Sequence, residues 1–169
     1  MKREIAEKWW AEHFAELPLI GYVPVSSTAG PGANSSVSSR TPFESANHGP
    51  LRGLDNAVRL VLYDQIVVLY LTQTELHVVS TGGMWKRRPR ELRHSIDRSG
   101  LRVQWFDYSE LKTGWRNFLI QIPDGTWMGV ASATMILGRD TAAKHGADTL
   151  IDWLGADAVE IDWRNPPAL

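Results

Sequence analysis

The stretch VVLYLTQTELHVVS, which spans residues 67–80, decides the fold. Two runs rich in Val, Leu and Tyr flank the polar residues Thr72-Gln73-Thr74-Glu75. β-branched and aromatic residues favour extended chain, and the second run alternates between its two faces. A polar connection this short joins antiparallel neighbours. The stretch therefore predicts a hairpin whose strands run over residues 66–72 and 75–81.

Similar segments lie on both sides of this hairpin. They predict further strands over residues 57–63, 101–106, 115–122 and 126–131. The last two are joined by Pro123-Asp124-Gly125, in which proline presets its φ angle and glycine accepts a left-handed conformation. The sequence therefore predicts five or six strands that are linked by short antiparallel turns.

A helix is expected to follow these strands. Between residues 140 and 154, apolar side chains recur with a helical period at Ala143, Ala147, Leu150, Ile151 and Leu154. Asp140 is a suitable N-cap, and Gly155 suits the position after the last turn. Residues 156–169 then form an acidic C-terminal tail, for which a short edge strand within 158–163 is the alternative.

The N-terminal segment predicts an amphipathic helix over residues 1–17. One helical stripe contains Ile5, Ala6, Trp9, Trp10, His13, Phe14 and Leu17. Pro18 limits the helix because the residue before a proline is pushed toward extended geometry. An isolated helix of about 16 residues is marginal in water. The stripe therefore needs a partner surface on the same chain, on another copy or on a membrane, and docking on the same chain is the default expectation.

Residues 18–50 are expected to be a Gly/Ser/Pro-rich linker or long loop, because much of the segment supplies little to bury. A phosphate-binding P-loop would need a lysine, and none lies between residues 9 and 85. The chain is thus divided into a helix over 1–17, a linker over 18–50, a domain over 51–155 and the tail over 156–169.

These elements predict an α+β fold in which a strongly bent antiparallel sheet is capped by the C-terminal helix. Residues 67–80 resemble the strand, Thr-x-x-x-Leu turn and second strand of bacterial PH-like or GRAM-like domains. The order of elements over residues 57–154 is similar to the PH-like roll, whereas the N-terminal helix and linker are not part of that pattern. The resemblance implies a non-catalytic binding or adaptor module for anionic lipid headgroups or peptides.

Composition excludes several classes of chemistry. The chain of 169 residues contains no Cys, so disulfides, thiolate catalysis and Cys-ligated metals are impossible. A net charge of −1 gives the whole molecule no attraction for nucleic acid. No early apolar run suits a signal peptide, and the longest apolar stretch, residues 66–71, is too short to cross a membrane. The expected location is cytoplasmic, with peripheral membrane contact as an alternative.

The densest basic segment runs over residues 85–102, and we predict that it forms the binding site. Seven Lys or Arg residues face only Glu91 and Asp97 there. The candidate binding residues are Trp85, Lys86, Arg87, Arg88, Arg90, Arg93, Arg98 and Arg102. In a PH-like fold this segment would be a loop that holds basic side chains against phosphates, beside a tryptophan suited to an interface.

Several partners remain open for this basic segment. The acidic residues of 140–169 could neutralise it within the chain or between copies, because six carboxylates there face only Lys144 and Arg164. A protein partner or self-association is therefore favoured, an anionic lipid headgroup comes second, and nucleic acid is disfavoured. A further interpretation is an immunity-type inhibitor protein that uses the acidic C-terminal segment.

Catalysis is the competing interpretation. The five histidines are His13, His48, His77, His94 and His145, and their spacing fits no metal site. We therefore expect neither a metal nor a cofactor. A small hydrolase or transferase with His and Asp side chains in a cleft remains the alternative, and a polar pocket that holds both groups would favour it. Trp105, Trp115 and Trp127 could form an aromatic platform, although cross-strand packing is favoured.

Overall fold

The computed structural model describes residues 1–27, 66–82, 88–110, 112–123 and 127–162. Within these ranges lie the α-helices α1 (Arg3–His13) and α3 (Ala142–Leu154) and the short 3-10 helices η3 (Arg98–Gly100) and η4 (Gly155–Asp157). The strands are β1 (Gly21–Ser27), β2 (Ile66–Leu71), β3 (Glu75–Gly82), β4 (Arg88–Asp97), β5 (Arg102–Glu110), β6 (Thr113–Gln121), β7 (Trp127–Ile136), β8 (Arg139–Asp140) and β9 (Ala158–Glu160).

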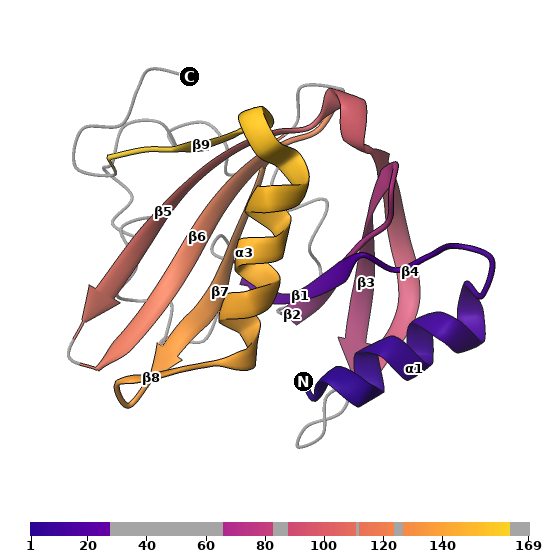
Figure 1. Cartoon of the computed structure of the whole chain (residues 1–169), viewed down its shortest axis with the longest axis horizontal. Coiled ribbons are helices and arrows are strands. Elements are labelled where there is room, and N and C mark those ends of the chain that lie inside the picture. The colour runs from indigo at the N-terminus through magenta and orange to yellow at the C-terminus, as the bar shows by residue number, and fades with distance from the viewer. Residues whose placement is uncertain (28–65, 83–87, 111, 124–126, 163–169) are drawn as a thin grey trace.

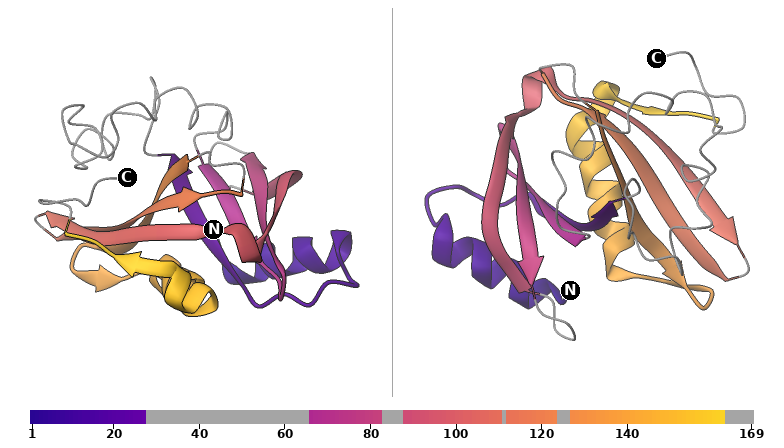
Figure 2. Two further views of the ribbon diagram at one scale, coloured as in Figure 1. Left: turned by 90° about the horizontal axis from the view of Figure 1, so that it is seen from above. Right: turned by 180° about the vertical axis from the view of Figure 1, so that it is seen from behind.

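These strands form one sheet with the order β4-β3-β2-β1-β7-β6-β5-β9, and β8 pairs with β7. Neighbours are antiparallel, except that β9 runs parallel to β5. The described sheet is strongly bent but unclosed, so that β1–β4 and β5–β7 form two halves at an angle (Figures 1 and 2). β1 joins the halves because it pairs with β2 along its length and with β7 at Ser26 and Ser27. The predicted α+β class with a C-terminal helix is confirmed.

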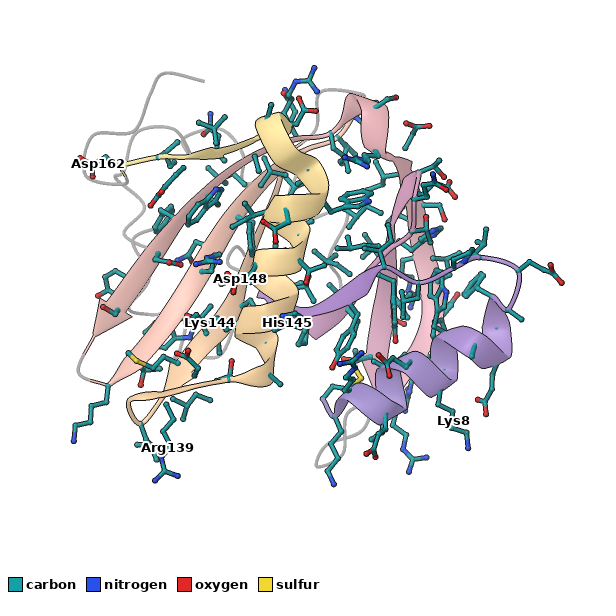
Figure 3. The ribbon with its side chains drawn as sticks, viewed as in Figure 1. Lys8, Arg139, Lys144, His145, Asp148 and Asp162 are labelled. Carbon is teal, nitrogen blue, oxygen red and sulfur yellow. The ribbon has the colours of Figure 1, made fainter. Side chains whose placement is uncertain are left out.

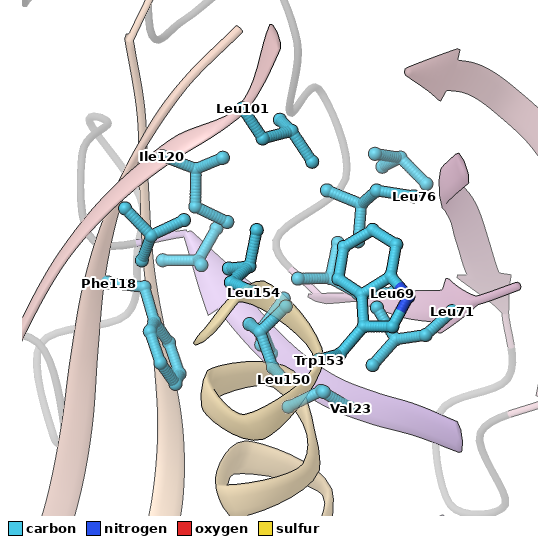
Figure 4. Close-up of a cluster of buried hydrophobic side chains, with 14 of the residues drawn as sticks. Val23, Leu69, Leu71, Leu76, Leu101, Phe118, Ile120, Leu150, Trp153 and Leu154 are labelled. Carbon is cyan, nitrogen blue, oxygen red and sulfur yellow. The ribbon is translucent and has the colours of Figure 1, made fainter. Parts of the chain in front are cut away.

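α3 lies inside the bend, between the two halves of the sheet (Figure 1). Its buried side chains meet a cluster of apolar residues from both halves, including Leu69 and Phe118 (Figure 4). The helix approaches β1 closely at Gly146, where a Cβ atom would lie 2.3 Å from the carbonyl oxygen of Tyr22. Gly155, with a φ angle of +60°, ends the helix as the sequence predicted. At the other end the N-cap is Thr141 and not the predicted Asp140, whose carboxylate instead binds Lys144.

α1 packs on the opposite face of the first half-sheet. Successive residues of β2 alternate between the faces, so that Leu69 points toward α3 whereas Tyr70 points toward α1. Trp10 is 2% exposed, and its ring lies 4.9 Å from that of Tyr70. The Tyr70 hydroxyl donates a hydrogen bond to the Ala6 carbonyl oxygen at 3.1 Å. The expected docking of this helix on its own chain is therefore confirmed.

Three of the predicted boundaries need correction. The helix predicted over residues 1–17 is α1, which ends at His13. The linker predicted over residues 18–50 includes residues 21–27, but these form β1 and belong to the sheet. Within the predicted acidic tail, residues 158–160 form β9, which is the edge-strand alternative. The remainder of the linker, residues 28–50, and the strand predicted over 57–63 lie outside the described residues.

Candidate functional site: the basic edge strand

The basic segment of the sequence forms a strand where a loop was expected. β4 pairs with β3 on one side and ends the described sheet on the other. The side chains of Arg88, Arg90 and Arg93 are exposed along it. We call the outer backbone edge of β4, together with the exposed side chains of these three arginines, the basic edge. Figure 1 shows it at the opposite side of the sheet from β5 and β9.

The other predicted binding residues do not join this edge. Arg98 lies in η3, where its guanidinium stacks on the ring of Trp153, 5.0 Å from the ring centroid. Arg102 lies on β5, and its guanidinium forms an ion pair with Asp157 at 3.1 Å. Trp85, Lys86 and Arg87 lie outside the described residues. The described residues of the predicted site are therefore divided. Three arginines lie on an exposed strand, whereas Arg98 and Arg102 contact residues of α3 and η4.

The arginines of the basic edge also differ in their partners. Arg93 is 3.1 Å from Glu91, on the same strand. Within the described ranges, neither Arg88 nor Arg90 forms an ion pair. The Arg90 guanidinium lies across Gly82 of β3, so closely that a Cβ atom there would be 1.7 Å from its Nε. Neutralisation by the acidic C-terminal segment, one of the sequence alternatives, is found at Arg102, which pairs with Asp157.

β4 is an irregular strand. Its register with β3 shifts between Val78 and Val79 and again between Val79 and Thr81. Of its apolar residues, Pro89 and Ile96 are buried and Leu92 is half-buried. They are three and four positions apart, because each β-bulge adds a residue to one strand of the pair. A search for period-two alternation therefore misses this strand, and the irregular spacing of these residues is its only signal.

A second cluster of charged side chains links α3 to the sheet. Arg116 of β6 is almost fully buried, and its guanidinium makes two 2.8 Å hydrogen bonds to the Asp107 carboxylate and one to Asp148 of α3. The hydrogen bonds to Asp107 raise the pKa of Arg116, although burial acts against them. The same guanidinium lies over the ring of Trp105, 4.7 Å from its centroid. All of its partners belong to the fold, so we assign this cluster a structural role.

The tryptophans do not make the aromatic platform considered from the sequence. Trp105 faces α3 with Arg116, whereas Trp115 lies beside Tyr108 on the other face of β5 and β6, with the ring centroids 6.1 Å apart. The side chain of Trp127 lies outside the described residues. Trp105 therefore packs on the face of the sheet toward α3, and Trp115 packs against a neighbouring strand on the opposite face.

A pocket of about 290 Å³ lies between α1, β1 and the first turns of α3. Its lining includes Glu7, Tyr22, His145 and Thr149, which is the combination of a histidine and a carboxylate that would favour an enzyme. However, Glu7 accepts a 2.6 Å hydrogen bond from Arg3, and the Thr149 hydroxyl donates to the His145 backbone carbonyl at 2.9 Å. Figure 3 shows His145 on α3 beside Lys144 and Asp148. Among the described lining residues, no hydroxyl is paired with a histidine base, so this pocket lacks the geometry of nucleophilic catalysis.

His77 is the buried histidine of the described chain. It is 2% exposed, its ring lies 5.0 Å from that of Trp10, and its Nδ1 is 2.8 Å from the hydroxyl of Ser95. Burial lowers the pKa of His77, and the Glu75 carboxylate, 3.7 Å away, opposes that shift. The buried Nε2 atom has no hydrogen-bond partner. His77 therefore connects β3 and β4 to α1 in its neutral form.

Acidification should weaken the fold through His77. Its pKa is lower in the folded chain than the value of about 6.5 of an unfolded histidine, so the unfolded state binds the proton more tightly. This contribution to stability is complete above pH 6.5 and is lost as the pH falls through the lowered pKa. Urea unfolding at pH 7.5 and pH 5 should show the loss, and His77→Gln should show less of it. His145→Gln, at an exposed position, is the control; an equal loss in wild type and His77→Gln would contradict this assignment.

Other kinds of site find no support in the described parts of the chain. No three His, Asp or Glu side chains gather there to hold a metal ion. Neither helix is long and apolar enough to cross a bilayer, again considering the described residues alone. No protein-family model matches the sequence, and no curated protein is similar enough to count as a match.

Proposed function

We propose that this chain is a non-catalytic binding module that recognises an anionic partner through the basic edge of β4. One observation carries the proposal: Arg88 and Arg90 are exposed, two positions apart on the last strand of the described sheet, and neither forms an ion pair within the described residues. An unneutralised pair of guanidinium groups attracts carboxylates and phosphates, and each group offers two parallel donors.

The architecture supports a binding role. β1–β4 form one half of the described sheet and β5–β9 the other, and the C-terminal helix lies between them. The PH-like resemblance drawn from residues 57–154 implies a binding module without catalytic groups, although β1, at residues 21–27, lies outside that range. Fold similarity alone does not identify a ligand, so the identity of the partner rests on the basic edge.

An acidic protein segment suits this edge better than a membrane does. The apolar stripe of α1, which offered a possible membrane contact in the sequence, is packed against β2 and β3. Glu91 lies between Arg90 and Arg93, and Asp97 ends the strand. An anionic bilayer would repel both carboxylates. A partner with spaced carboxylates can place its charges between these positions. A nucleic-acid backbone has continuous negative charge and would meet the same repulsion.

Charge reversal tests the proposal. The double variant Arg88→Glu/Arg90→Glu should weaken binding of a short fluorescent peptide, in which Glu alternates with Thr, by about tenfold or more, because two attractions become repulsions. The double variant Lys112→Glu/Arg139→Glu makes the same change in net charge at exposed positions on the other half-sheet (Figure 3 labels Arg139), and it should bind nearly as wild type does.

Fluorescence anisotropy at low and at physiological salt measures both variants. Wild-type affinity should fall as salt rises, because the Debye length shrinks to about 8 Å at physiological ionic strength. Equal losses in the two double variants would mean that net charge alone drives binding, and no loss in the β4 variant would contradict the proposal.

A further inference from the structure

We infer that the basic edge binds its partner by strand addition, so that an acidic extended segment of another protein pairs with the backbone of β4. This inference rests on the proposed function and specifies how the partner is held. A strand at the end of a sheet presents a row of N–H and C=O groups that another chain can pair with. β4 has ten residues and exposed side chains on both of its faces at Arg93, His94 and Ser95.

The molecule already fills its other edge in this way. At the β5 edge, the chain adds its own acidic segment as β9, and the Ile161 N–H donates to the Trp105 carbonyl oxygen at 2.9 Å. An ion pair between Arg102, the first residue of β5, and Asp157, the residue before β9, flanks this pairing. β4 offers the same combination of backbone edge and arginine, but no strand occupies its outer side in the described part of the chain.

The irregularities of β4 restrict what can bind there. Proline, bulges and exposed arginines are the features by which natural sheets discourage pairing with neutral strands. Pro89 and both register shifts lie before His94, whereas residues 94–97 pair regularly with residues 75–78 of β3. The regular part can accept backbone hydrogen bonds, and Arg88 and Arg90 disfavour a second copy of β4 because like charges would meet. An acidic segment avoids this like-charge repulsion and can pair with the regular part of β4, so the edge favours it over a second copy.

Backbone N-methylation of the probe separates strand addition from simple charge attraction. The experiment compares the alternating Glu–Thr peptide with the same peptide methylated at every backbone nitrogen, which keeps the charge but removes all backbone donors. We expect methylation to weaken binding to the full-length wild-type chain by at least about tenfold. In parallel, amide hydrogen exchange within residues 94–97 should slow when the unmodified peptide is bound, and exchange in β6 should not change.

The outcomes distinguish the inference from the proposed function. If both peptides bind equally and Arg88→Glu/Arg90→Glu weakens both, the basic edge binds anions without strand addition, and only the inference is overturned. If neither peptide binds, or if phosphatidylserine vesicles bind in their place, both are overturned. A concentration-dependent dimer that the Arg88→Glu/Arg90→Glu variant dissociates would assign β4 to a second copy and would also overturn the inference.

Discussion

Trp10→Ala should destabilise the chain by about 3–5 kcal/mol, the usual cost of truncating a buried aromatic side chain. Trp10 is 2% exposed, stacks against Phe14 and Tyr70, and donates its indole N–H to the Leu17 carbonyl oxygen at 2.8 Å. The substitution removes the centre of the contact between α1 and the sheet and leaves that carbonyl without its donor. Calorimetry should show a melting temperature lower by on the order of 10 °C.

The neighbouring tryptophan provides the control for this prediction. Trp9 is half-buried, and its ring lies 5.7 Å from that of Tyr70 at the rim of the same cluster. Trp9→Ala should therefore cost clearly less than Trp10→Ala, since less apolar surface leaves a buried environment. Equal effects of the two substitutions, or no effect of Trp10→Ala, would contradict the docking of α1 described here.

Trp153→Ala should have a similarly large effect, about 3–5 kcal/mol, through the contact between α3 and the first half-sheet. Trp153 is 6% exposed and lies near Leu69 and Leu71 in the main cluster (Figure 4). Its indole N–H donates a 2.7 Å hydrogen bond to the Thr72 carbonyl oxygen in the β2–β3 turn. Denaturant unfolding monitored by circular dichroism measures the loss.

Trp153→Phe separates packing from hydrogen bonding. Phenylalanine retains an aromatic ring but cannot donate to Thr72, and a buried acceptor that loses its donor costs about 1–3 kcal/mol. We expect the free energy of unfolding of Trp153→Phe to lie between that of wild type and that of Trp153→Ala. If Trp153→Phe is as stable as wild type, the indole hydrogen bond does not help to hold α3 in the bend.

Local patterns were sufficient to predict much of this fold. The hairpin over residues 67–80 is found as β2 and β3, because β-branched and aromatic residues at consecutive positions favour extended chain wherever they occur. The helix before Gly155 is also found, because its apolar period and its C-terminal glycine are local signals. These elements need no knowledge of distant contacts.

The missed strands depend on distant contacts. β1 is a short segment that contains Pro24 and precedes a Gly/Ser-rich stretch, and its pairing with β2 and β7 makes it a strand. β4 is rich in arginine and interrupted by bulges, so its pairing with β3 overrides weak local preference. Trp10 is buried and Trp9 only half-buried, and this difference likewise depends on where Tyr70 lies.

The candidate site was predictable in composition but not in geometry. The sequence located the arginines, and the spacing of charges suggested an anionic partner. It could not show that Arg98 stacks on Trp153 or that Arg102 pairs with Asp157, because those partners lie far along the chain. Nor could it show that Arg88 and Arg90 lie on the last strand of the described sheet.

Chemical-shift mapping tests the central claim, that the partner binds at β4, most directly. The ¹⁵N-labelled chain is titrated with the alternating Glu–Thr peptide, and the shift of each backbone amide is recorded. We predict that the largest shifts fall within residues 88–97, that β5 and β9 change little, and that Arg88→Glu/Arg90→Glu suppresses the response. The account would be contradicted if the shifts were concentrated at the pocket around His145 or along β9. It would also be contradicted if no amide of the described residues shifted.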